Sequence, residues 1–233
     1  TEAAPLTVQG SATSAVSSSA YTNSPEEVEG RGGLVWIKSR ASNVDHQLVD
    51  TERGANKYLS SNLNSAEETE LNRLTAFTSD GFLLNGNNTE VNKNGDDFVS
   101  WTFAKQKGFF DVVTYTGDYT FPRELPHNLG STPGMVIIKK TSGNQNWMVR
   151  HSALPELDFL NLNEGDAAIS STDPDGKPPF EMNDTHLTFD SQYYSNFTNG
   201  AGHGYVAYLF ADDAPMFGPD GDESIIKCGS YTG

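Results

Sequence analysis

Cysteine and basic residues are both scarce in this sequence. Its 233 residues include a single cysteine, Cys228, so no disulfide can form within one chain. Only 15 Lys and Arg residues stand against 31 Asp and Glu residues, which gives a net charge of −16. A surface this negative repels phosphate groups, so nucleic acids and anionic membrane surfaces are poor partners. No apolar run approaches the roughly 20 residues needed to cross a bilayer.

Catalytic and metal-binding motifs are also missing. The five histidines form no HExxH pattern and no cluster with cysteine, and no GxSxG nucleophile motif occurs. The many acidic residues single out no pair that would cleave a glycosidic bond. Cys228 lies in the apolar run Ile225–Cys228, which predicts a strand and an inert buried thiol. We therefore expect no enzymatic activity, no cofactor and no metal.

Two acidic turn sequences leave calcium binding open. They contain Asp173 with Asp175, and Asp220 with Asp222. Oxygen ligands on turn-forming loops are what calcium prefers, although neither loop has the full spacing of a calcium-binding hand. Asp next to Gly is also ordinary turn chemistry, so these residues do not by themselves predict a metal site.

An internal repeat organises the chain. Residues 101 positions apart match in the first part, and the offset becomes 107 after a six-residue insertion near Asp173–Pro179. Several matches in the same order indicate a duplication. The matched segments are Val35–Lys38 with Val136–Lys139, Tyr58–Asn62 with Phe159–Asn163, and Phe98–Ala104 with Tyr205–Ala211.

The repeat predicts the domain limits. We expect an N-terminal segment at 1–30 that is partly ordered, a first module at 31–107 and a second module at 108–223. The motif Thr114–Gly117 is echoed by Ser230–Gly233 and more weakly by Ala20–Asn23. This echo predicts that 224–233 begin a third module, and that the chain, which starts without methionine, is a segment of a longer protein.

The periodicity within each copy is that of β-structure. In the closing segment Val99, Trp101 and Phe103 alternate with smaller residues, so we expect this large face, including Trp101 and its counterpart Tyr208, to pack in a core. Ser65–Leu74 has the form of a capped short helix. Further strands are expected around Leu48, Tyr58, Phe82, Val112, Val149, Leu160 and Leu187. The sequence predicts an all-β protein of two tandem jelly-roll or lectin-like β-sandwich modules of about 100 residues each.

Three aromatic residues are the candidates for ligand binding. Trp147 and the pair Tyr193 and Tyr194 are the aromatics least clearly assigned to a core strand. Aromatic side chains on loops can stack on pyranose rings, so these residues predict a weak sugar-binding site.

The ordered motifs resemble a module that recurs in tail-fibre and other virion appendage proteins of bacteriophages, especially marine and cyanobacterial ones. The resemblance covers the chain from about residue 30 to 233. It implies a lectin- or glucanase-like β-sandwich without catalytic residues, in a virion or extracellular setting. It also implies other fibre subunits as partners, a homo-oligomer such as a trimer, and a glycan on the host surface. The motifs are Leu34–Lys38, Arg53–Ala55, Tyr58–Asn62, Ser79–Phe82, Phe98–Phe103, Gly108–Gly117, His127–Gly130, Pro133–Lys139 and Tyr205–Ala211.

Three hypotheses follow for function. The first is a structural and host-recognition component of a phage tail fibre or virion appendage, which presents binding loops on tandem sandwiches. The second is a carbohydrate-binding module of a cell-surface adhesin or extracellular filament. The third is a glycan depolymerase whose active site lies between subunits, and release of reducing sugar would distinguish it from the other two.

Overall fold

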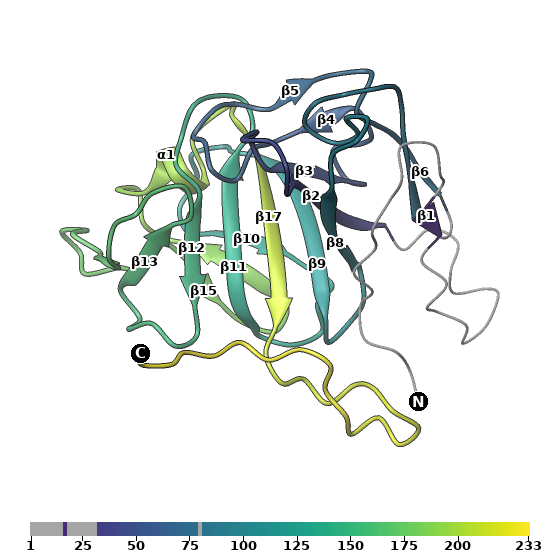
Figure 1. The fold of residues 1–233 in the computed structure, drawn as a ribbon. Coiled ribbons are helices and arrows are strands. Elements are labelled where there is room, and N and C mark those ends of the chain that lie inside the picture. Colours follow the sequence, from purple (N-terminus) through teal and green to yellow (C-terminus); the bar gives the residue numbers. More distant parts are fainter. Residues whose placement is uncertain (1–15, 18–31, 79–80) are drawn as a thin grey trace. The chain divides into compact units, whose positions relative to one another are not determined.

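The structure, a computed structural model, describes residues 16–17, 32–78 and 81–233 and is built from antiparallel β-strands (Figure 1). Within these residues one short helix occurs, α1 (Ser195–Thr198). The all-β prediction is confirmed. Of the N-terminal segment expected at 1–30, only β1 (Val16–Ser17) is described, and the echo at Ala20–Asn23 lies outside the described residues.

The described chain divides into two compact units. Unit 1 comprises the described residues up to Leu63 together with Glu67–Lys105, and unit 2 comprises Asn64–Ala66 with Gln106–Gly233. The boundary expected after residue 107 lies next to this division. Residues 64–66 belong to unit 2, and so do residues 224–233, which the sequence predicts to begin a third module.

The C-terminal residues of unit 2 form no strand. The backbone N–H of Cys228 donates to Asp212 Oδ1 (3.0 Å), and the N–H of Asp213 donates to the Ile226 carbonyl (2.9 Å). Lys227 Nζ pairs with Asp213 Oδ2 at 2.9 Å. The strand expected at Ile225–Cys228 is therefore absent, because these contacts tie the segment to residues 212–213 instead of to a sheet edge.

Unit 1 is a small sandwich of two three-stranded sheets. One sheet has the order β3-β2-β8, the other has the order β1-β7-β6, and β4 with β5 forms a further pair. The core between the sheets includes Val35 and Ile37 from β2 and Leu74 and Phe82 from the second sheet. The remaining strands of unit 1 are β2 (Gly33–Ser39), β3 (Gln47–Asp50), β4 (Lys57–Tyr58), β5 (Glu68–Thr69), β6 (Leu74–Thr78), β7 (Gly81–Leu84) and β8 (Phe98–Ala104).

Unit 2 is a larger sandwich of the same kind. A six-stranded sheet of order β14-β13-β12-β11-β17-β9 faces a three-stranded sheet of order β10-β16-β15, and β11, β17 and β9 lie side by side in Figure 1. Its core joins Val136 and Ile138 of β11 to Leu187 and Phe189 of β16. The strands are β9 (Phe110–Thr116), β10 (Arg123–Pro126), β11 (Pro133–Lys140), β12 (Met148–His151), β13 (Asp158–Asn161), β14 (Ile169–Ser170), β15 (Glu181–Met182), β16 (His186–Phe189) and β17 (Gly204–Ala211).

The two units repeat one strand arrangement. The pairing β3-β2-β8 in unit 1 corresponds to β12-β11-β17 in unit 2, and β1-β7-β6 corresponds to β10-β16-β15. Residues 70–73 connect β5 to β6, whereas residues 171–180 connect β14 to β15, so the insertion lies in this loop as the sequence predicts. The seven segments expected to be strands from their composition are all strands.

The large face of the closing strand in unit 1 is turned away from the core. Val35 and Ile37 of β2, which lie in the core, are opposite Thr102 and Ser100 of β8. Residues directly opposite in an antiparallel pair share a face, so Trp101 lies on the other face, and 40% of its surface is exposed. The prediction of a core position for Trp101 is wrong, because the core of unit 1 is filled by the branched side chains of β2.

In unit 2 both faces of the closing strand are buried. Ala207 and Leu209 of β17 belong to the sandwich core. Tyr208, on the opposite face, is 0% exposed, and its ring stacks 6.4 Å from the ring of Phe110. Tyr208 is therefore buried as predicted, but its ring does not point into the core between the sheets.

The short helix expected at Ser65–Leu74 does not form. The segment contains β5, which pairs with β4 with Tyr58 opposite Glu68. The Tyr58 hydroxyl donates to Glu68 Oε2 at 2.7 Å. The carboxylate that the capping pattern required is thus used in a cross-strand contact, and the strand pair replaces the helix.

These positions predict a contrast in stability between two aromatic truncations. Tyr208→Ala is expected to lower the free energy of unfolding by about 3–5 kcal/mol, as is typical for a buried ring. Trp101→Ala is expected to lower it by only about 1–2 kcal/mol, because the indole already contacts water. Urea unfolding of the two variants measures both values, and equal losses would contradict the assignment of Trp101 to an exposed face.

Candidate functional site

Of the three aromatic residues predicted to bind sugar, two have no exposed ring. Trp147 is 0% exposed, its ring stacks 6.4 Å from that of Tyr208, and Lys139 Nζ lies 5.9 Å from it. Tyr194 is 6% exposed, and its ring meets that of Phe159 edge to face in the core. Both rings are buried against other aromatic rings, so neither presents a face on which a sugar could stack.

Tyr193 is the predicted residue that remains available. It is 58% exposed, and its ring meets the ring of Tyr194 edge to face at 5.1 Å. The hydroxyl of Thr172 donates to the Tyr193 hydroxyl at 3.2 Å. Its role in ligand binding stays a prediction.

The exposed aromatic cluster of unit 1 is centred on Trp36 and Trp101. The two residues are directly opposite each other on β2 and β8, so their rings share one face of the sheet. Their centroids are 6.1 Å apart at an angle of 70°, an edge-to-face arrangement. Both tryptophans lie in segments that the sequence repeat identifies as strands, but the repeat does not say which face of the sheet is covered.

His46 fixes the ring of Trp36. The indole Nε1–H of Trp36 donates to His46 Nδ1 at 2.8 Å, and the two rings meet at 69° with centroids 5.8 Å apart. Burial lowers the pKa of His46, and the charge of Lys38 lowers it further, against the opposing effect of Asp45. The imidazole is therefore neutral at pH 7 and accepts the indole proton, which holds the aromatic cluster in one geometry.

An asparagine clamp positions His46. The backbone N–H of His46 donates to Asn62 Oδ1 (3.0 Å), and Asn62 Nδ2 donates to Asp45 Oδ1 (2.7 Å). These two bonds fix the orientation of the Asn62 amide, because its oxygen accepts from His46 and its nitrogen donates to the preceding residue, Asp45. The clamp thus links a carboxylate and an amide to the imidazole that holds Trp36.

Unit 2 repeats the clamp with different side chains. The backbone N–H of Trp147 donates to Asn163 Oδ1 (2.9 Å), and Asn163 Nδ2 donates to Asn146 Oδ1 (3.0 Å). Asn163 corresponds to Asn62 at the repeat offset, while Asn146 and Trp147 stand where unit 1 has a carboxylate and an imidazole. The same backbone geometry thus carries polar, partly exposed groups in unit 1 and a buried indole in unit 2.

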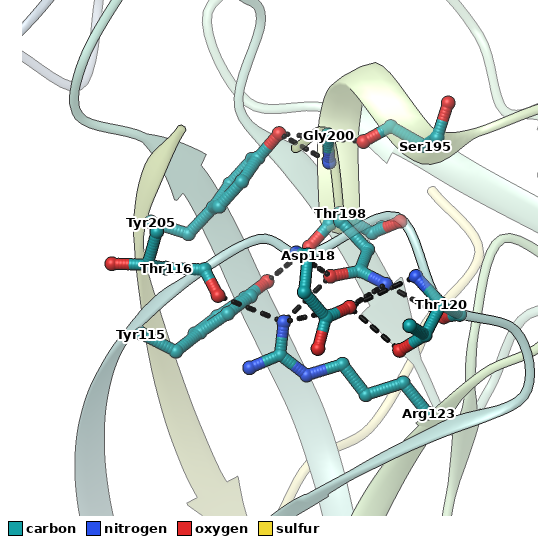
Figure 2. Close-up of polar contacts among 10 residues, drawn as sticks. Tyr115, Thr116, Asp118, Thr120, Arg123, Ser195, Thr198, Gly200 and Tyr205 are labelled. Atoms are coloured by element: carbon teal, nitrogen blue, oxygen red, sulfur yellow. Dashed lines mark hydrogen bonds and ion pairs between the residues drawn. The ribbon is translucent and has the colours of Figure 1, made fainter. Parts of the chain in front are cut away.

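A second polar network in unit 2 is centred on the fully buried Asn199. Its Oδ1 accepts from Arg123 Nη1 (2.7 Å) and from the backbone N–H of Asp118 (3.1 Å), and its Nδ2 donates to the Thr120 carbonyl (2.9 Å). Figure 2 shows Asp118, Thr120 and Arg123 drawn together by these contacts. Hydrogen bonds from the hydroxyl and the backbone N–H of Thr120 lower the pKa of Asp118 to about 2, so its carboxylate stays ionised beside Arg123.

Two stacked tyrosines support the same network. The rings of Tyr115 and Tyr205 lie 5.2 Å apart at 16°, and Figure 2 shows them side by side. The Tyr115 hydroxyl donates to the Thr198 carbonyl (2.7 Å), and burial raises the pKa of Tyr115 well above its usual value. These hydrogen bonds tie the loop after β9 to the segment around Asn199.

The loop held by Asn199 carries an exposed aromatic residue. Tyr119 is exposed, has φ 61°, and its ring meets that of Phe121 edge to face at 5.4 Å. A non-glycine residue at positive φ is uncommon and requires support from its surroundings. Here the support comes from Asn199, whose carbonyl accepts the Tyr119 N–H at 3.0 Å.

The two acidic loops differ in their contacts. Asp173 accepts hydrogen bonds from the Ser191 hydroxyl and from the backbone N–H of Asp175, so its carboxylate stabilises a turn. Asp220 and Asp222 lie exposed in a turn near the C-terminal end. In the part of the chain that the structure describes, no group of three or more His, Cys, Asp and Glu side chains could hold a metal ion. The described helix is also too short to span a membrane.

Acid is expected to break the bond between Trp36 and His46. A protonated imidazole carries a hydrogen on Nδ1 and cannot accept from the indole. Because folding lowers the pKa of His46 below 6.5, the stability from this contact is fully present above pH 6.5 and decreases as the pH falls toward that lowered pKa. Tryptophan fluorescence between pH 7.5 and 4.5 should show this transition. His46→Gln retains an acceptor that does not titrate, and an identical transition in that variant would refute the assignment.

Loss of the Asn199 side chain should destabilise unit 2. Asn199→Ala leaves several buried polar partners without a hydrogen bond, and we expect a loss of about 2–3 kcal/mol in the free energy of unfolding. Asn43→Ala, at an exposed position, is the matched control and should change stability little. Urea unfolding measures both variants. A free energy of unfolding of Asn199→Ala equal to that of the wild type would show that the network contributes nothing.

Comparison with known proteins identifies a family but no characterised relative. Searches among curated proteins and among solved structures found no match. One family matches residues 11–233, a range that includes all described residues of both units. The chain belongs to the family described as Domain of unknown function (DUF7483).

Proposed function

We propose that this chain is a structural and host-recognition component of a bacteriophage tail fibre or other virion appendage, and that it binds a glycan of the host surface through Trp101. In this proposal the tandem sandwiches act as spacers that carry a binding face, and no step of catalysis is involved. Its setting is the virion, its partners are other fibre subunits, and it assembles as a homo-oligomer.

The exposed indole of Trp101 is the observation that carries the proposal. A pyranose ring presents C–H groups on one face, and these pack against an aromatic ring while the hydroxyls stay hydrated at the edge. Trp101 projects from a strand and is supported edge-on by Trp36, so its ring loses little freedom when a ligand binds. A rigid, exposed aromatic ring beside hydrogen-bonding groups suits a sugar better than an apolar partner.

The charge of the chain supports the same class of ligand. With a net charge of −16, polyanions such as nucleic acids are repelled over long range. Sugars without charge are not affected by this field. The acidic composition also keeps a chain with exposed aromatic rings soluble.

Glycan binding by Trp101 can be tested directly. The purified chain is titrated with a panel of charged and neutral host-surface polysaccharides while tryptophan fluorescence is recorded. We expect at least one to bind, and Trp101→Ala to weaken its binding at least tenfold. Leu71→Ala, which removes another exposed apolar side chain from unit 1, should leave the affinity unchanged.

Three outcomes would count against the proposal. Binding that is equal in the wild type and in Trp101→Ala would place the ligand elsewhere, and absence of binding to any host polysaccharide would remove the recognition role. Release of reducing ends during the titration would favour a depolymerase instead.

A further inference from the structure

We infer that Asp45 and His46 form a donor and acceptor pair beside the indole cluster of unit 1 that selects neutral hexopyranoses with adjacent hydroxyls. This inference rests on the proposed function, since it assigns the sugar class that Trp101 would stack against. It concerns the polar groups next to the aromatic rings, one of which, His46, also holds Trp36 in place.

The donor of the pair follows from the tautomer of His46. An indole N–H can only donate, so His46 Nδ1, which lies 2.8 Å from Trp36 Nε1, must accept. The proton of the neutral imidazole is then on Nε2. Among the described residues no group accepts a hydrogen bond from this Nε2–H, and His46 is only partly buried. The imidazole therefore has one N–H available for a ligand oxygen.

The acceptor of the pair is the carboxylate of Asp45. Its Oδ1 accepts from Asn62 Nδ2 at 2.7 Å, whereas its Oδ2 has no donor within the described part of the chain. An ionised carboxylate only accepts, and hydrogen bonds to it are stronger than those between neutral groups. Asn62 is bonded to both residues, through its Oδ1 to the backbone N–H of His46 and through its Nδ2 to the Asp45 carboxylate. In the proposal, two neighbouring hydroxyls on one sugar donate to this carboxylate and accept from the imidazole.

The local charges favour a neutral sugar. Lys38, the cation whose charge acts on His46, donates Nζ hydrogens to the backbone carbonyls of Ser39 (2.8 Å) and Ser42 (3.5 Å). The carboxylate of Asp45 would lie against the carboxylate of a uronic acid, and like charges in contact are unfavourable. Lys38 is therefore already engaged and does not attract a uronic acid, whereas a neutral hexopyranose avoids the repulsion from Asp45.

The duplication provides an internal comparison. Unit 2 has the same asparagine clamp through Asn163, but Asn146 and Trp147 replace the carboxylate and the imidazole. Asparagine at this position therefore also accepts the clamp hydrogen bond, at 3.0 Å compared with 2.7 Å for aspartate. It follows that Asp45→Asn should fold normally, and that only unit 1 carries the proposed pair.

The inference is tested with methyl glycosides of glucose, galactose and mannose, and with methyl glucuronide, titrated into the full chain and followed by tryptophan fluorescence. We expect at least one neutral glycoside to bind at least tenfold more tightly than the glucuronide. Asp45→Asn should weaken that neutral sugar at least fivefold and reduce the discrimination against the glucuronide. Asn146→Asp, the matched change in unit 2, should leave both affinities as they are.

The outcomes separate this inference from the proposed function. If Trp101→Ala abolishes binding but Asp45→Asn changes neither affinity nor preference, the polar pair is refuted and the aromatic platform stands. Preference of the wild type for the glucuronide, or failure of all three neutral glycosides to bind while a charged polysaccharide does, also overturns the pair alone. Absence of binding by every sugar and polysaccharide overturns both. A melting temperature of Asp45→Asn equal to that of the wild type shows that any loss is local.

Discussion

The antiparallel pairing of β2 with β8 is the constraint on which both the fold of unit 1 and its candidate site depend. A strand has only two faces, and opposite residues share one. Because Val35 and Ile37 fill the core, Trp36 and Trp101 must lie together on the other side of the sheet. The aromatic cluster is thus a direct consequence of which side chains of β2 are buried.

The asparagine clamp shows how one backbone arrangement can serve two purposes. Asn62 and Asn163 make the same two hydrogen bonds. Each accepts from a backbone N–H, that of His46 or Trp147, and donates to the side chain of the residue before it, Asp45 or Asn146. In unit 2 the residue whose N–H is accepted is Trp147, and its buried ring adds apolar packing. In unit 1 it is His46, and its ring is partly exposed and keeps a polar edge. A duplicated scaffold therefore carries different chemistry at equivalent positions.

The two units also differ in how they stabilise their loops. Unit 2 uses the buried Asn199, which joins the loop after β9 to the turn before β17, and such a network is stabilising only when every member is satisfied. The sequence contains Asn199 as one asparagine among many, and nothing local marks it. Its partners Asp118 and Arg123 are about 80 residues away along the chain, so only folding brings them together.

The sequence by itself determined the β class, most of the strands and the duplication, including the loop that holds the insertion, although the strand expected at Ile225–Cys228 does not form. These depend on local alternation and on matching order, which are readable without contacts. The burial of Trp147 and Tyr194, the exposure of Trp101 and the loss of the helix at Ser65–Leu74 were decided by tertiary structure. In each case the outcome depended on contacts that a local pattern does not contain: β2 opposite β8, Phe159 against Tyr194, and Tyr58 bonded to Glu68.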